Sequence, residues 1–313
     1  MKNKKLIISA LLYGLIIVFL AQYIRTIDFR EITGLSVNYW YLLVASLTSL
    51  AFRYWGVFIW KIILERLGAV HLPSFKTLSA VYAKAWLGRY IPGTVTWIAG
   101  KVFFASSHGI SKKRLVTASI LEGAVQVIAI FAISLIFLGL DSRLDVVSTQ
   151  LRIILVAIGI VTSLVLVPRV FNRIIVLLAR LFRKKDFNAN ELKSNKKAVS
   201  SAFLLYSIGY FISGASYFFL AKSIYPIGFD NFFFTVAAFN IAGAIGIASI
   251  VTPSGLGVRE GIQLLLLPLI MPREAALIVT VVARLWSVII DLLFFGLAQL
   301  FHKKSKSTYT EHV

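Results

Sequence analysis

Residues 84–101 read KAWLGRYIPGTVTWIAGK, and residues 250–260 read IVTPSGLGVRE. Each stretch combines a proline–glycine break with cationic side chains, and each lies among apolar runs of helix length. In lipid, a broken helix leaves backbone N–H and C=O groups unpaired, so such breaks persist only where protein or a water-filled cavity covers them. Two charged breaks in matching halves of a chain are typical of a translocation site. We therefore expect a polytopic membrane transporter.

The composition is that of a membrane protein. Of the 313 residues, 58% are hydrophobic and 15% are charged, and the mean hydropathy is +0.84. A helical span takes about 20 residues, so this length fits roughly six to eight spans. The formal charge of +20 would favour nucleic acid in a soluble protein. Here the cations flank apolar runs, so we expect contacts with the bilayer and no nucleic-acid partner.

The apolar runs predict an all-α fold with six full spans and two broken segments. The broken segments are 75–105, interrupted at Pro92, and 232–270, interrupted at Pro253. Each is either a re-entrant helical hairpin or a pair of short spans, and both alternatives return the chain to the side it left. The predicted full spans are 6–24, 39–63, 115–140, 153–167, 199–220 and 276–301.

The distribution of Lys and Arg predicts the orientation. With the N-terminus in the cytoplasm, the inside segments hold 24 cations and the outside segments hold six. This bias favours an inner-membrane protein with both termini cytoplasmic. One of the inside segments, residues 169–197, is expected to be a basic connector.

The order of the predicted elements indicates an inverted-topology repeat. Residues 1–145 and 146–303 each contain two spans, a broken segment and a further span, and residues 304–313 form a cytoplasmic tail. Pro92 precedes Glu122 by 30 residues, and Pro253 precedes Arg284 by 31. The two breaks should then enter from opposite faces and meet near the midplane.

Cations and helix N-termini around the breaks predict an anion-binding site. The helix after each break presents free N–H groups and a positive dipole end, with Thr94 and Ser254 placed as caps. Phosphate is the natural occupant of such a site. The alternative is that the kinks serve only packing and that long cationic side chains extend to lipid headgroups. The four candidate cations are Lys84, Arg89, Lys101 and Arg259.

A second group of charged residues is expected to form ion pairs. Glu122 and Arg284 hold corresponding positions in the repeat, so we expect them to pair with each other. Asp291 lies two turns from Arg284 on the same helical face, and Glu260 adjoins Arg259. We expect a static ion pair, and the alternative is a gate or a proton relay.

Enzymatic motifs are largely absent from the sequence. The chain has no His-Glu-x-x-His and no Gly-x-Ser-x-Gly, and its four histidines fall in loops or tails. It also has no cysteine, which excludes thiolate metal sites. We expect no catalytic residue, metal or cofactor. Two alternatives stay open: a membrane-embedded glycosyl- or acyltransferase, or a non-catalytic scaffold of a lipid- or cell-envelope-synthesis complex.

Two motifs and one arginine resemble the lysylphosphatidylglycerol synthase transmembrane (flippase-like) family. The motifs are GRYIPGTVTWIAGK at residues 88–101 and TPSGLGVREG at residues 252–261, and the arginine is Arg284. The resemblance covers nearly the whole chain and implies a stand-alone lipid flippase module, without the soluble aminoacyl-transfer domain of some relatives. The implied substrate is an anionic phospholipid or a polyprenyl-phosphate-linked glycolipid, whose headgroup crosses the membrane. The implied partners are this anionic lipid or lipid-linked saccharide and the bilayer, with a second copy or biosynthetic enzymes as further candidates.

Two positions depart from the pattern of that family. Lys101 stands where an arginine is usual, which is a mild change. Gly123 follows Glu122 where many relatives have Glu-Arg. The second departure removes a cation and leaves the partner of Glu122 open.

Overall fold

The computed structural model of the chain describes residues 37–90, 96–181, 195–249 and 255–310. In these ranges the ordered elements are all helical, which confirms the predicted all-α polytopic fold. The α-helices are α3 (Tyr39–Arg66), α4 (Phe75–Trp86), α5 (Thr96–Ser106), α6 (Lys112–Leu140), α7 (Thr149–Leu164), α8 (Pro168–Leu181), α9 (Lys196–Ile224), α10 (Phe232–Ala248), α11 (Val258–Leu266) and α12 (Arg273–Thr310). Short 3-10 helices are η1 (Leu87–Tyr90), η2 (Ser142–Val146), η4 (Phe229–Asn231) and η6 (Leu267–Leu269).

Several of these helices are long and apolar enough to cross a membrane. Five such stretches occur in the described ranges, and the bent pair α7 and α8 is a sixth if counted as one span. They include the predicted spans 39–63, 115–140, 199–220 and 276–301, whereas the predicted span 6–24 lies outside the described residues. The five stretches are Tyr39–Arg66, Lys112–Leu140, Lys196–Ile224, Phe229–Ala248 and Arg273–Lys303.

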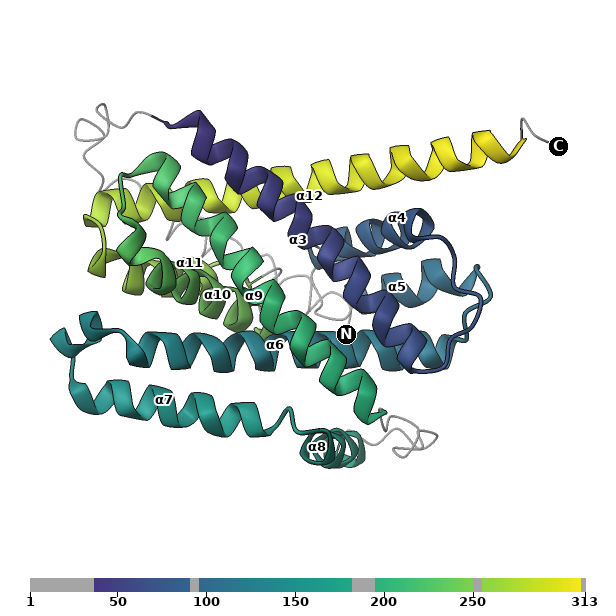
Figure 1. Ribbon diagram of the computed structural model, residues 1–313, viewed down its shortest axis with the longest axis horizontal. Helices are drawn as coiled ribbons and strands as arrows, with labels where there is room; N and C mark the ends of the chain where they lie inside the picture. Colours follow the sequence, from purple (N-terminus) through teal and green to yellow (C-terminus); the bar gives the residue numbers. More distant parts are fainter. Residues whose placement is uncertain (1–36, 91–95, 182–194, 250–254, 311–313) are drawn as a thin grey trace, which may run out of the picture.

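In Figure 1, α6 and α12 run along the length of the molecule, α3 and α9 run obliquely, and α7 lies beside α6 at the lower edge. Polar caps start several helices: Asn38, Ser74, Ser148 and Asn195 each accept a hydrogen bond from a backbone N–H of the first turn. α3 packs along α9, while α6 packs against α7 and α10. Leucine, isoleucine and phenylalanine side chains remain exposed on the outer faces, as is typical of helices that face lipid.

The two ends of the bundle differ in charge. One end, which we call the cation-rich end, is formed by the end of α3, the beginnings of α4, α6 and α9, and the last part of α12. It lies toward the right in Figure 1. Its Lys and Arg residues include Arg66, Lys76, Lys112, Lys113, Arg114, Lys196, Lys197 and Lys303.

The two broken segments differ in the lengths of their helices. In the first, α4 has 12 residues and α5 has 11. At about 1.5 Å per residue, neither reaches the roughly 30 Å of a hydrocarbon core, so the pair forms a hairpin of short helices. In the second, α10 has 17 residues and reaches span length together with η4, whereas α11 has only nine. The second segment thus combines one span-length arm with one short arm.

The expected basic connector contains a helix that the sequence analysis missed. α8 begins at Pro168 and turns 85° away from α7. Proline fits the first helical turn, and the following residues alternate cations with apolar side chains at helical spacing. Phe171 of α8 is buried in the core together with Ala198 and Val199 of α9, which fixes α8 against the bundle.

Candidate functional site

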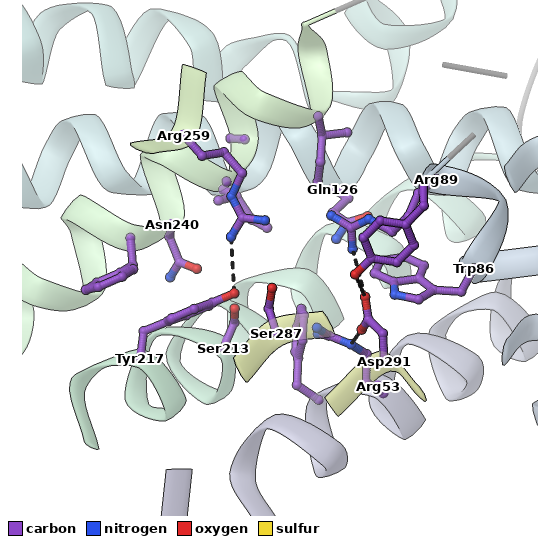
Figure 2. A pocket seen from close by; sticks show the side chains of 17 residues that line it. Arg53, Trp86, Arg89, Gln126, Ser213, Tyr217, Asn240, Arg259, Ser287 and Asp291 are labelled. Atoms are coloured by element: carbon purple, nitrogen blue, oxygen red, sulfur yellow. Dashed lines mark hydrogen bonds and ion pairs between the residues drawn. The ribbon is translucent and has the colours of Figure 1, made fainter. Parts of the chain in front are cut away.

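A polar cavity, which we call the central pocket, lies between the helices of the bundle. Its wall is built by residues of α3, α4, η1, α6, α9, α10, α11 and α12. Its volume of about 50 Å³ has room for a few water molecules. Figure 2 shows the side chains that surround it. The polar ones are Arg53, Arg89, Tyr90, Gln126, Ser213, Tyr217, Asn240, Arg259, Ser287 and Asp291.

Asp291 of α12 organises one side of the central pocket. Its side chain is only 1% exposed, and its Oδ1 lies 2.6 Å from Nε of Arg53. Its Oδ2 accepts a hydrogen bond of 2.7 Å from the Tyr90 hydroxyl and lies 3.9 Å from Nη1 of Arg89. One carboxylate therefore serves two arginines that come from different helices, α3 and η1.

Arg259 of α11 occupies the opposite side of the pocket (Figure 2). Its Nη2 donates a hydrogen bond of 3.1 Å to the hydroxyl of Tyr217. It forms no ion pair with any residue that the structure describes. Its only hydrogen-bond partner there is thus a neutral phenol, whereas Arg53 and Arg89 both pair with the carboxylate of Asp291.

Two glycines allow Arg259 to reach this position. Gly255 has a φ of +67°, which favours glycine. A Cβ on Gly255 would lie 2.4 Å from the Cα of Gly246, and a Cβ on Gly246 would lie 2.3 Å from Cγ of Arg259. The chain before α11 therefore approaches the backbone of α10 closely, and the side chain of Arg259 crosses Gly246 into the pocket.

The indole of Trp86 supports the cations on the Asp291 side. The guanidinium carbon of Arg89 lies 4.5 Å from the centroid of this ring, and that of Arg53 lies 5.5 Å away. A cation–π contact of this kind stabilises a cation without neutralising it. The positive charge of the arginines is therefore retained.

The lining of the central pocket carries an excess of positive charge. Three arginines and one aspartate line it, which leaves a formal excess of two positive charges. Buried charge is stabilised by an opposite charge or by water, so an anion is the complementary ligand. Hydroxyl and amide groups of Ser213, Asn240 and Ser287 add neutral hydrogen-bonding capacity around the cations.

A second group of buried charge, the sealed cluster, consists of Tyr82, Lys101, Glu122 and Tyr206. Lys101 and Glu122 are both 0% exposed, and Nζ of Lys101 lies 2.6 Å from Oε2 of Glu122. The hydroxyls of Tyr82 and Tyr206 donate hydrogen bonds of 2.8 and 3.3 Å to Oε1 of Glu122. The ammonium also lies 3.8 Å from the ring centroid of Tyr82 and 4.6 Å from that of Trp97. The cluster is formally neutral.

The structure thus divides the predicted cations between different environments. It brings Arg89 and Arg259 together at the central pocket, one from each broken segment. Lys101 is enclosed in the sealed cluster and does not line that pocket. Lys84 is exposed and lies near the cation-rich end. The predicted caps Thr94 and Ser254 lie outside the described residues.

The predicted pair between Glu122 and Arg284 is wrong. Glu122 pairs with Lys101, and Arg284 instead has its Nη1 3.7 Å from Oε1 of Glu260. Asp291 faces Arg53 rather than Arg284. Similar spacing from a break did not predict the partners, because α5 supplies Lys101 to Glu122 and α11 supplies Glu260 to Arg284. Lys101 also answers the open question about the partner of Glu122, and a side chain at Gly123 would meet the ring of Trp97 at 3.1 Å.

Several residues of the central pocket were not predicted as binding residues. Arg53 carried a signal, because a charge in the middle of a membrane span is by default a functional residue. Tyr90 was within the first motif but carried no charge. Tyr217 and Asn240 carried no signal, because tyrosine and asparagine in a helix are compatible with packing alone.

The fold and the central pocket define a polytopic helical membrane protein with a buried cationic cavity. The family model described as "Lysylphosphatidylglycerol synthase TM region" matches residues 6–294. The chain therefore belongs to this family, as the motifs around both breaks predicted. No curated protein matches it. Family membership supports a lipid-related function in the bilayer.

Proposed function

We propose that the protein is a flippase that moves the headgroup of an anionic lipid across the inner membrane. The observation that carries this proposal is Arg259, a partly buried guanidinium whose described polar partner in the central pocket is a neutral phenol. The phosphate of a lipid headgroup supplies the missing negative charge and accepts paired hydrogen bonds from a guanidinium. The acyl or prenyl chains would stay in the bilayer.

The other groups around the pocket favour a headgroup with hydroxyls. Asn240, Ser213 and Ser287 can hydrogen-bond to glycerol or sugar hydroxyls, and Gln126 adds a further amide. An anionic phospholipid or a polyprenyl-phosphate-linked glycolipid fits this chemistry. Asp291 limits the excess charge to two, which favours binding weak enough to permit release.

We also propose an inverted repeat with both termini in the cytoplasm. The support is that α4 and α5 lie toward the cation-rich end, while α10 and α11 lie toward the other end (Figure 1). The chain has no cysteine, so single cysteines can be introduced and labelled with an impermeant thiol reagent. Positions 30, 145 and 228 should label from outside, and positions 112, 185 and 305 should not. Labelling of 112 and 228 from the same side contradicts the repeat.

The direct test of transport uses purified protein in liposomes that contain a fluorescent phosphatidylglycerol. Wild-type protein should make the inner-leaflet label accessible to an impermeant quencher, and Arg259→Ala should slow this at least about tenfold, because one charge-assisted contact is lost. Arg273→Ala, which removes an exposed arginine at the start of α12, is the control and should match wild type. Equal rates for Arg259→Ala and wild type contradict the proposal.

The same liposomes separate transport from the transferase alternative. We propose that the protein is not an enzyme, so the lipid should be recovered chemically unchanged after transport. Mass spectrometry of the extracted lipid, with glycosyl and acyl donors added, provides the measurement. Transfer of a donor group to the lipid would favour the transferase, and unaltered activity after loss of Arg259 and Arg89 would favour a scaffold.

A further inference from the structure

A second cavity opens at the cation-rich end, and we call it the vestibule. It lies between α4, α5, the turn that follows α5, the first turn of α6 and the last part of α12. Its volume is about 470 Å³. This is within the range of roughly 300–1,000 Å³ that is typical of small-molecule sites, and far larger than the central pocket.

The chemistry of the vestibule suits an anion. Lys84, Lys112, His108 and His302 line it, together with hydroxyls that include Ser107. None of the twelve residues that line it is acidic. Lys84 and Lys112 form no ion pair with any residue in the described ranges, so both ammonium groups are available to a ligand.

The walls of the vestibule are held in place by contacts between helices. Nε2 of Gln299 on α12 donates a hydrogen bond of 3.0 Å to the carbonyl oxygen of Ala80 on α4. Oγ1 of Thr77 lies 3.4 Å from Nδ1 of His302, which joins the same two helices. Nζ of Lys84 lies 5.2 Å from the centroid of the Phe104 ring. Contacts between α4 and α12 and between α4 and α5 therefore hold the walls of the cavity together.

The vestibule and the central pocket are connected through one element. Lys84 of the vestibule precedes Arg89 of the central pocket by five residues along α4 and η1. At the helical rise, five residues cover only about 8 Å. The two cavities therefore have cations on successive turns of one continuous element.

We propose that the vestibule is a loading site that binds the phosphate group of a headgroup before it enters the central pocket. This inference rests on the proposed flippase function and on the cytoplasmic orientation of the cation-rich end. The ligand class is a phosphate ester held by lysine and histidine donors. Free phosphate and a lipid headgroup share this chemistry, and the experiment distinguishes the two sources.

The test uses histidines as reporters, since His108 and His302 line the vestibule and His71 does not. NMR spectra of histidine-labelled protein in neutral detergent are recorded during titration with sodium phosphate, with sodium chloride at matched ionic strength as reference. A second series compares nanodiscs of phosphatidylglycerol with nanodiscs of phosphatidylcholine. The variants His108→Gln and His302→Gln assign the signals.

The expected result is that the His108 and His302 signals shift with phosphate, while the His71 signal stays in place. Shifts in both series identify phosphate itself as the ligand, and shifts with phosphatidylglycerol alone identify a membrane-held headgroup. Either result supports the proposal. Absence of shifts in both series, or equal shifts at His71, overturns it.

Lysine variants separate the vestibule from general surface charge. The double variant Lys84→Gln with Lys112→Gln should weaken the apparent affinity for phosphate at least about tenfold, since two charged donors are lost. Lys76→Gln removes an exposed lysine of α4 that does not line the vestibule, and it should leave the affinity unchanged. Equal weakening by Lys76→Gln contradicts a dedicated site.

Failure of the vestibule and failure of the flippase proposal give different results. Arg259→Ala should slow transport at least about tenfold but leave the His108 and His302 shifts intact, because Arg259 lines the other cavity. If transport depends on Arg259 and the histidines do not respond, only the loading site is wrong. If Arg259→Ala transports at the wild-type rate, the flippase proposal fails regardless of the histidine shifts.

Discussion

The central pocket and the sealed cluster both hold buried charge beside a broken segment, yet they differ in balance and access. In the sealed cluster, one ammonium meets one carboxylate, and two tyrosine hydroxyls satisfy that carboxylate further. In the central pocket, three guanidinium groups and one carboxylate line a cavity with room for water, and two of the guanidinium groups pair with that carboxylate. A neutral, enclosed pair fixes how helices pack, whereas an open excess of charge selects a ligand. Burial of a cation alone therefore does not identify a binding residue.

The largest expected effect is on stability, in the sealed cluster. Glu122→Gln should lower the free energy of unfolding by about 3–5 kcal/mol, because Lys101 would stay buried without its counter-charge. Thermal or denaturant unfolding in detergent provides the measurement. Adding Lys101→Met should recover much of the loss, because a neutral side chain of similar length then fills the site. Strictly additive losses would mean that the two residues do not act as a pair.

Exchanging the cation types should separate the two environments. Arg259→Lys keeps the charge of the central pocket but loses the paired donors, so we expect about tenfold slower transport with little change in stability. Lys101→Arg overfills the sealed cluster and should cost about 1–3 kcal/mol of stability. Parallel measurement of transport and unfolding on both variants checks this. If both variants change stability alone, the proposed division of roles is wrong.

A methyl group at Gly246 should displace Arg259 without removing its charge. The added Cβ meets Cγ and Cδ of Arg259 at 2.3 and 2.8 Å, so the side chain has to shift. We expect Gly246→Ala to slow transport severalfold and to cost about 1–3 kcal/mol of stability through overpacking. Gly296→Ala is the matched control, since a Cβ there meets nothing within 4 Å. Similar results for the two variants would contradict the role given to Gly246.

The smallest expected effect comes from Tyr217→Phe. It removes the one hydrogen bond that Arg259 donates to a described residue in the central pocket. We expect the binding free energy for an anionic lipid to weaken by about 1 kcal/mol, which is roughly a fivefold loss of apparent affinity. Native mass spectrometry of the variant with phosphatidylglycerol measures this change. Tyr206→Phe, which alters the sealed cluster instead, should leave lipid binding unchanged.

The sequence predicted the fold better than the pairing of charges. Apolar runs and the Lys/Arg bias can be read from the order of residues without knowing how the helices pack. The spans at α3, α6, α9 and α12 were therefore predicted correctly. Pairing depends on how helices rotate and approach one another. Spacing from the breaks suggested Glu122 with Arg284, but the packing of α5 against α6 places Lys101 against Glu122 instead.

The candidate site was predicted in part for the same reason. Arg89 and Arg259 were found because they adjoin the breaks, and the breaks are visible in the sequence. The neutral partner Tyr217 comes from α9, far from either motif, and only the packed bundle brings it to Arg259. α8 was missed because its arginines suggested a solvated connector, although its apolar residues follow a helical period.

The indole of Trp86 forms a wall shared by both groups of charge. The guanidinium of Arg89 lies over its ring. The ring also stacks on that of Tyr82 in the sealed cluster, with centroids 5.9 Å apart. The emission wavelength of an indole responds to charge near the ring. Movement of Arg89 toward an arriving anion should therefore shift the emission wavelength of Trp86. Trp86 is therefore a fluorescent probe at the boundary between the sealed cluster and the central pocket.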